Sequence, residues 1–362
     1  MRTKDIHRFS SVDYEATVRG MRARGEDVHD TGRAHWQQHK TMDPLVDVTQ
    51  NRGSHNAMVP NDDGTCTLTN GIAIPVLNMF DGTGSTAQYV ADFFHACEKQ
   101  YQLMEGARPR YNMQLASAVV QDVVDNTPVV QLSQFESDER SADQVRLLIP
   151  ASGGGDATED YDLGLAAGLF VYADAWTYYG LKGYFTITAD EIGRGFVTAD
   201  NVERYLGQSL DQFQAGKRID TAEICQRLSE HWHVFYLQVP GVGRRTTEWW
   251  NERLGHGRVI QVGDPSILAE IRAGLIYATE AKNPSMSGLG EFLLTGNQSF
   301  NATDIERVWR TIQVAKQHFG AQAKLPGYHE IPLPGEKFAH YRHAWPIGHP
   351  RAVENTNVAT TV

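Results

Sequence analysis

The sequence predicts an α/β protein built on a doubly wound, mostly parallel sheet. Residues 72–80 form a nearly continuous apolar run, which is typical of a central strand buried on both faces of a sheet. A short polar loop and then apolar residues at helical spacing follow this run, which is the order of a βα unit. Further apolar strands alternate with helical segments as far as about residue 278, as in domains with a parallel sheet.

The composition indicates a folded chain and argues against two classes of partner. The 362 residues are 41% hydrophobic, enough for one large domain with extensions or for two smaller domains. The formal net charge of −11 leaves no positive excess to neutralise phosphates, so neither nucleic acid nor a membrane surface is expected as a partner. No apolar leader opens the sequence, and no apolar run approaches the roughly 20 residues that span a bilayer. We therefore expect a cytoplasmic protein.

The cysteines indicate neither a disulfide framework nor a zinc site. Cys66, Cys97 and Cys225 are odd in number, far apart and without CxxC spacing. Each is expected to be a small, buried apolar side chain.

An N-terminal extension, residues 1–70, is expected before the domain. It is polar, with patches that could form short helices, and it contains one short alternating strand at 65–69. The first βα unit follows. Its central strand is predicted at 72–80 and its helix at 86–105, where Gly106 ends the helical pattern.

The middle of the chain predicts a sheet edge and then a long helix. Two β-rich runs, 113–124 and 129–135, flank turn residues at 125–128, so we expect them to pair antiparallel at the edge of a mixed sheet. The apolar spacing of residues 161–179 predicts one well-buried helix. A strand is predicted directly afterwards at 183–188.

The α/β domain is expected to span residues 71–280. Its remaining elements are predicted as helices at 198–210 and 221–230, a strand at 233–239, a helix at 249–254, a strand at 257–262 and a helix at 265–278. Thr198 supplies capping chemistry for the first of these helices. Residues 281–362 are expected to form a C-terminal extension that wraps the domain, with a helix at 302–318.

Polar residues at the carboxyl end of the central strand can hold a divalent cation. Asp81, Thr83 and Ser85 alternate in one short loop, so a carboxylate and two hydroxyls can converge on one point. Gly82 and Gly84 let the backbone bend tightly between them. Hard oxygen ligands of this kind suit Mg²⁺, with its near-octahedral coordination at about 2.1 Å, better than zinc or copper.

Further acidic residues fall where the topology would bring them to the same rim. Glu159, with Asp156 nearby, follows the triple glycine at 153–155, and Asp190 follows a later strand. The carboxyl ends of neighbouring parallel strands share one rim, so these acids are expected beside the first loop. Several carboxylates on one rim repel one another unless a cation lies among them. For Asp156, stabilisation of a helix N-terminus is an equally supported role.

Together these segments resemble the metal-ion-dependent adhesion site of von Willebrand factor A (VWA) domains, of the bacterial, intracellular type. The loop Asp81-Gly-Thr-Gly-Ser85 is similar to the family's Asp-x-Ser-x-Ser, with Thr83 in place of the first Ser. Asp156-Ala-Thr-Glu159 is similar to an Asp-Ala-Pro-Glu stretch, with Thr158 where that stretch has Pro. Residues 186–190 resemble the Ile-Thr-Asp end of a later strand, and the resemblance covers about three-fifths of the chain.

The resemblance implies a protein-binding module without catalytic activity. In such a module Asp81, Thr83 and Ser85 would bind Mg²⁺, or Mn²⁺ or Ca²⁺, directly. Glu159 and Asp190 would bind it directly or through water, and an Asp or Glu of a protein partner would complete the coordination. The resemblance further implies an AAA+ ATPase of the MoxR type as a partner.

Two functions of other classes stay open. A metal-assisted hydrolase or phosphoesterase would use the same rim, with Asp156 or Glu191 as a general base or as the holder of a second metal. A structural or assembly subunit would keep the fold with a vestigial metal site. Nucleotide binding is disfavoured because no Gly-Lys-Ser/Thr follows the triple glycine, and the sequence has no Gly-x-Ser-x-Gly elbow of a serine hydrolase.

Overall fold

A six-stranded sheet forms the centre of the protein in the computed structural model. The structure describes residues 30–50, 52–106, 111–125, 128–138, 140–150, 158–209, 218–296, 300–326, 328, 331 and 333–338. Within these residues the strand order is β12-β11-β8-β4-β5-β6, and all neighbours are parallel except β5 and β6. The predicted α/β class with a mostly parallel sheet is confirmed, and so is the antiparallel edge.

The central strand is buried along its whole length, as its apolar run predicted. The strands of the sheet are β4 (Ile72–Asp81), β5 (Tyr111–Val120), β6 (Val130–Leu132), β8 (Gly183–Ala189), β11 (Trp232–Gln238) and β12 (Val259–Gln261). Alternate side chains of β4 enter two different cores: Val76 and Phe80 pack on one face, Leu77 and Met79 on the other. The strand is therefore apolar at nearly every position because helices cover both faces.

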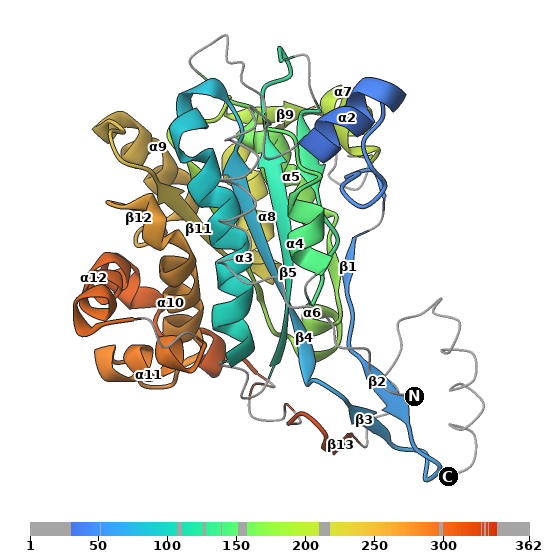
Figure 1. The fold of residues 1–362 in the computed structure, drawn as a ribbon, viewed down its shortest axis with the longest axis vertical. Coiled ribbons are helices and arrows are strands. Elements are labelled where there is room, and N and C mark those ends of the chain that lie inside the picture. Colours follow the sequence, from blue (N-terminus) through green and yellow to red (C-terminus); the bar gives the residue numbers. More distant parts are fainter. Residues whose placement is uncertain are drawn as a thin grey trace.

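Helices lie against both faces of the sheet (Figure 1). One core contains residues of α3 (Val90–Gly106), α4 (Arg140–Val145), α6 (Asp174–Tyr179), α10 (Leu268–Glu280), α11 (Met286–Gly296) and α12 (Ala302–Ile312). The other contains residues of α5 (Tyr161–Leu169), α7 (Ala199–Leu206), α8 (Thr221–His231) and α9 (Arg244–Leu254). Thr198 caps α7 as predicted, since its hydroxyl accepts from Asn201 N–H at 3.2 Å.

The single long helix predicted at 161–179 is wrong. The chain leaves the helix after Leu169, forms the short strand β7 (Tyr172–Ala173) and enters α6. The cause is a tertiary contact, because β7 pairs in parallel with β1 (Gly53–Ser54) of the N-terminal extension, and Tyr172 N–H donates to Arg52 C=O at 3.0 Å. The apolar spacing of residues 161–179 does not reveal this pairing, because the partner strand is more than 100 residues away in the sequence.

Several helix ends also differ from the predicted ones. The helix expected at 265–278 begins with a 3₁₀ turn, η3 (Pro265–Ile267), and the one expected at 302–318 continues from α12 into the 3₁₀ segment η4 (Gln313–His318). The helix predicted to start at residue 249 starts at Arg244, in a polar turn of helix that shows no apolar periodicity.

The two extensions meet at the foot of the sheet. The N-terminal one contributes α2 (Asp30–His39), β2 (Met58–Pro60) and β3 (Cys66–Leu68). Strand β13 (Lys337–Phe338) pairs antiparallel with β3, giving a small sheet in the order β13-β3-β2 that projects below β4 in Figure 1. Segments that precede and follow the α/β domain in the sequence thus form one small sheet.

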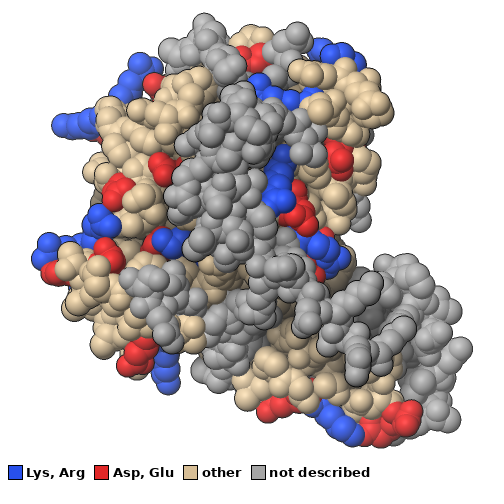
Figure 2. Space-filling model, in the orientation of Figure 1, with Lys and Arg blue, Asp and Glu red and all other residues tan. Residues whose placement is uncertain are grey.

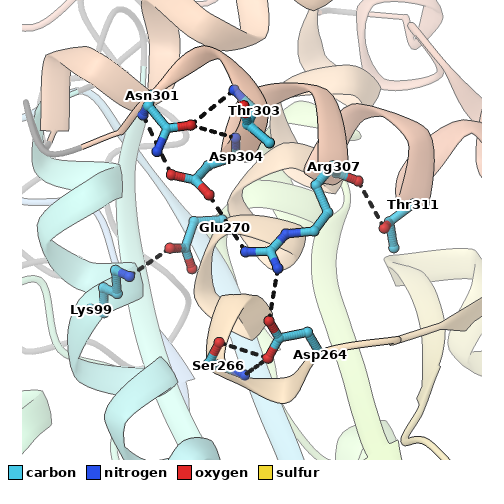
Figure 3. A network of polar contacts seen from close by, with 9 residues as sticks. All are labelled: Lys99, Asp264, Ser266, Glu270, Asn301, Thr303, Asp304, Arg307 and Thr311. Carbon is cyan, nitrogen blue, oxygen red and sulfur yellow. Dashed lines mark hydrogen bonds and ion pairs between the residues drawn. The ribbon is translucent and has the colours of Figure 1, made fainter.

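Polar contacts attach the C-terminal helices to the domain (Figure 3). The side chain of Asn301 accepts from the N–H groups of Thr303 and Asp304 and so begins α12 with a capping box. Arg307 of α12 pairs with Asp264 at 2.9 Å. Nearby, Lys99 of α3 pairs with the buried Glu270 of α10 at 2.5 Å.

The surface and the cysteines agree with the composition. On the face in Figure 2, basic and acidic side chains of the described residues are interspersed. None of the helices formed by the described residues combines the length and the apolar content that a membrane span requires. Cys66, Cys97 and Cys225 are free and buried, as expected.

Candidate functional site

Asp81 ends the central strand and is completely buried. It lies beside Val120 of β5, and the preceding Phe80 lies beside Thr188 of β8, so neighbouring strands flank it on both sides. Gly82 follows, and its N–H still donates to Val120 C=O at 3.0 Å. A Cβ atom at Gly82 would lie only 2.5 Å from Cγ1 of Val119, so a larger residue would clash with the side chains of β5.

The loop after β4 brings two hydroxyls together above Asp81. Thr83 N–H donates to Asp81 Oδ1 at 2.7 Å, and the hydroxyl oxygens of Thr83 and Ser85 lie 3.3 Å apart. Thr83 is buried, whereas Ser85 is exposed, so the pair leads from the interior to solvent. The Thr86 hydroxyl lies 2.9 Å from Asp81 C=O and 3.1 Å from Thr83 C=O, which fixes the curvature of the loop. The two hydroxyls of the predicted loop therefore lie side by side, next to the end of β4.

A tyrosine from the core that contains α5 holds the carboxyl group of Asp81. Tyr161, the first residue of α5, is fully buried and donates its hydroxyl hydrogen to Asp81 Oδ2 at 2.5 Å. Burial, and then the nearby charges of Asp81, Asp190 and Glu159, raise the pKa of Tyr161 above its usual range. The phenol therefore stays protonated and lies within electrostatic reach of three of the predicted acidic ligands.

The carboxyl group of Asp81 is also influenced by Asp190. The pKa of Asp81 is raised to about 7, and burial is the largest cause. The charge of Asp190 also raises this pKa, whereas the hydrogen bond from Tyr161 lowers it. Asp190 directly follows β8, and its Oδ1 is buried without a hydrogen-bond partner among the described residues. Two carboxylates from neighbouring strand ends thus share one rim, as the topology predicted.

Glu159 lies on the segment that enters α5 and is 4% exposed. Its N–H donates to Ile192 C=O at 3.1 Å, and it forms a parallel bridge with Gly193, so this segment runs beside the loop that carries Asp190. Asp156 lies outside the described residues.

Two aromatic residues that the sequence did not assign to the site hold the Asp190 loop in place. Tyr236 and Trp250 are both fully buried, and their rings stack with centroids 4.3 Å apart. The Tyr236 hydroxyl and the Trp250 indole N–H each donate to Glu191 C=O, at 3.1 and 3.0 Å. The sequence does not indicate this role, because an aromatic residue in a helix gives no sign of which carbonyl its N–H will reach.

Arg194 connects three loops around the rim, and the sequence did not predict this role. Its guanidinium pairs with Asp122 at 2.6 Å and Asp160 at 2.9 Å, and it reaches the Thr158 hydroxyl at 3.3 Å. Both aspartates are buried. The loops that follow β5 and β8 and the segment that precedes α5 are therefore joined through one cation.

The donor set limits which cation could bind. Among the described residues, no three His, Cys, Asp or Glu side chains converge to hold a metal ion. A cation at Asp81 would therefore have to use the hydroxyls of Thr83 and Ser85 and water as further ligands. Mg²⁺ commonly takes one or two carboxylates and keeps several waters, so these residues fit it, whereas they do not form a zinc site.

Comparison with known proteins finds weak structural similarities. No family model matches the sequence, and no curated protein matches it. The structure is similar to a von Willebrand factor type A protein from Catenulispora acidiphila, with 16% identity over 62% of this chain and 46% of that chain and a TM-score of 0.32. It is also similar to the pilus adhesin SpaC from Lactobacillus rhamnosus GG, with 10% identity over 71% of this chain and 34% of that chain and a TM-score of 0.36. The chain spans less than half the length of either one, and these TM-scores are too low to support a function.

Proposed function

We propose that this protein is a VWA-like module that binds a divalent cation at the Asp81–Ser85 loop and, through it, an acidic side chain of a protein partner. The observation that carries the proposal is the arrangement at the end of β4. The buried carboxylate of Asp81 accepts from Thr83 N–H in a loop whose two hydroxyls lie 3.3 Å apart. Asp190, on the same rim, has a buried oxygen without a partner among the described residues. A cation would offset the repulsion of the two carboxylates.

The topology supports the VWA arrangement. Strand β4 has β5 on one side and β8 on the other, so the chain reverses its direction of progress across the sheet at β4. Ligands of doubly wound sheets bind outside the carboxyl ends of the strands at such a point. This order supports a domain of the doubly wound type, with Asp81 at its switch point.

In this proposal Asp81, Thr83 and Ser85 bind the cation directly, with Mg²⁺ favoured over Mn²⁺ and Ca²⁺ by the small number of carboxylates. Asp190 and Glu159 act on it through water, because no three acidic side chains of the described residues converge on one point. Asp156, beyond the described residues, is proposed to act beside Glu159.

The partner completes the coordination from the solvent side. Gly84 and Ser85 are exposed, so an open position of the cation would face outward. A carboxylate bound to a dication is a strong and directional contact, which suits an Asp or Glu of the partner. The resemblance extends the proposal to an AAA+ ATPase of the MoxR type as that partner. No catalytic step is needed.

A comparison of Thr83 variants tests the site. We expect MgCl₂ to raise the melting temperature of the wild type and of Thr83→Ser, which keeps the hydroxyl. It should not raise that of Asp81→Ala, or that of Thr83→Val, in which a methyl group replaces the hydroxyl at nearly the same side-chain shape. Calcium and manganese are tested in parallel. The absence of any shift with all three ions, or an equal shift in all four proteins, would overturn the proposal.

A second experiment addresses the partner. Affinity capture from the native host with wild type and Asp81→Ala, each with Mg²⁺ and with EDTA, should yield a protein that is retained only by wild type with Mg²⁺. Capture that is the same in all four samples would show that the cation does not mediate the contact.

A further inference from the structure

The outer edge of the sheet at β12 borders a groove of about 930 Å³. In Figure 1 β12 is the outermost strand on its side, with α9 above it and α12 below it. Residues of α9, of the β12 segment and of the α12–η4 segment line the groove. None of them belongs to the proposed cation site.

The hydrogen bonds to β11 fix which way the backbone of β12 faces. Tyr236 N–H of β11 donates to Arg258 C=O at 2.8 Å, and Val262 N–H donates to Gln238 C=O at 2.7 Å. Along a parallel strand, successive residues direct their N–H and C=O groups to alternate sides. Residues 258, 260 and 262 therefore face β11.

Val259 and Gln261 consequently direct their N–H and C=O groups to the outer edge, where β12 has no further strand among the described residues. Both residues line the groove. An edge strand that presents backbone donors and acceptors in this way is a template for another extended segment.

The charges that border the groove are positive, although the whole chain carries a formal charge of −11. Its lining residues include Arg310 and Lys316 but neither Asp nor Glu. Lys316 is exposed, and it has no acidic partner within the described part of the chain. Arg310 pairs with Glu306 at 2.6 Å on the exposed side of α12. Lys316 therefore gives the groove one positive charge that is available to a carboxylate of a bound segment.

An apolar contact point lies beside these charges. Val314 of η4 lines the groove and is 52% exposed, one of the most exposed large apolar side chains of the described residues. Apolar side chains of a bound strand could cover it.

We propose that this groove binds an extended segment of a protein partner, which adds to the edge of β12 as a further strand and places a carboxylate near Lys316. Main-chain bonds to Val259 and Gln261 would give affinity, and Lys316 and Val314 would select the side chains. Edge-to-edge pairing with a second copy is disfavoured because it would bring two cationic grooves together.

The test uses two variants of one residue. Gln261→Pro removes an N–H that takes no part in pairing with β11, so the sheet keeps its bonds while the outer edge loses a donor and is blocked by the proline ring. Gln261→Ala keeps the N–H and is the matched control. The probes are fluorescein-labelled peptides of alternating Val and Thr with either one Glu or one Lys, and binding is measured by fluorescence anisotropy.

We expect the Glu peptide to bind wild type and Gln261→Ala alike, and Gln261→Pro at least about tenfold more weakly because main-chain pairing is lost. Lys316→Glu should reverse the preference between the Glu and Lys peptides. Amide hydrogen exchange over residues 258–262 should slow when peptide binds. All variants are checked for wild-type melting temperature.

Three results would overturn the proposal. These are no binding of the Glu peptide by wild type at millimolar concentration, equal binding by the two Gln261 variants, and a wild-type dimer in sedimentation that Gln261→Pro dissociates. Peptide binding should persist in Asp81→Ala and in EDTA, so failure of the cation site and failure of the groove are separable.

Discussion

The hydroxyl of Tyr161 donates a hydrogen bond of 2.5 Å to Oδ2 of Asp81, although neither side chain reaches solvent. The bond joins the start of α5 to the end of β4 across the floor of the candidate site. Asp81 Oδ1 accepts from Thr83 N–H, so both carboxylate oxygens are oriented by the protein. Each oxygen keeps a second lone pair that could face a cation.

Tyr161→Phe should separate the orientation of the Asp81 carboxylate from the binding of the cation. Loss of the hydroxyl leaves a buried carboxylate oxygen without its donor, so we expect the metal-free protein to lose about 1–3 kcal/mol of stability. Because the phenol is not a proposed ligand, the rise in melting temperature with Mg²⁺ should be at least as large as in wild type. Thermal unfolding with and without MgCl₂ measures both. If the variant responds as little as Asp81→Ala, Tyr161 is part of the binding site itself.

Replacing Arg194 should destabilise the rim more than any surface substitution. Arg194→Ala leaves Asp122 and Asp160 buried without their shared cation, and the loss is expected to be about 3–5 kcal/mol. Arg194→Lys should restore little, because one ammonium group does not reproduce the geometry of the guanidinium fork. Urea unfolding gives the free energies. Arg244→Ala, which breaks a solvent-exposed pair with Glu248, is the control and should not change stability measurably.

His233 should make the protein sensitive to mild acid. Its Nε2 lies 3.1 Å from Gln322 Oε1, and burial lowers its pKa from 6.5 to about 3. The unfolded chain then binds the proton more tightly than the folded chain. The stability that the neutral His233 contributes is therefore complete above pH 6.5. The free energy of unfolding should fall by up to about 1.4 kcal/mol per pH unit between pH 6.5 and 3.

His233→Gln tests this assignment, because it can still hydrogen bond but does not titrate. Its stability deficit relative to wild type should shrink as the pH falls from 7 to 4 in urea unfolding experiments. A constant deficit over that range would mean that His233 does not carry the effect.

Gly164→Ala should destabilise the protein although alanine favours helices. A Cβ atom here would lie 2.5 Å from Met79 Sδ and 3.3 Å from Val120 Cβ, because α5 packs closely on the sheet. We expect a loss of about 1–3 kcal/mol from overpacking, against a gain of about 1 kcal/mol in helix propensity. Gly263→Ala, where an added Cβ meets no atom within 4 Å, is the control in the same thermal unfolding assay. Equal melting temperatures for the two variants would contradict the packing argument.

The central strand and the first loop of the candidate site could be predicted because their cause is local. Burial on both faces of the sheet requires apolar residues throughout Ile72–Phe80, and a loop that gathers oxygen atoms requires polar residues at alternate positions in Asp81–Ser85. Both requirements leave a continuous pattern in the sequence. The shared rim of Asp81 and Asp190 followed from the parallel order of the strands.

The supporting residues could not be predicted because their cause is tertiary. Tyr161 and Trp250 have the same apolar spacing as any helix residue that packs in a core, and only the fold shows which oxygen each hydroxyl or N–H reaches. Arg194 follows a strand in a loop that looks solvated, yet its partners come from two other loops. The break between α5 and α6 similarly depends on β1.

The pairing of β3 with β13 has a consequence for the order of folding. The whole α/β domain lies between these strands in the chain, so a nascent protein presents the β3 edge long before its partner strand is synthesised. Closing so long a loop carries an entropic cost and depends on the domain having brought its ends together first. During that interval β3 is an open edge that could accept β13 from another copy, so exchange of C-terminal segments between molecules is the misassembly that this fold most invites.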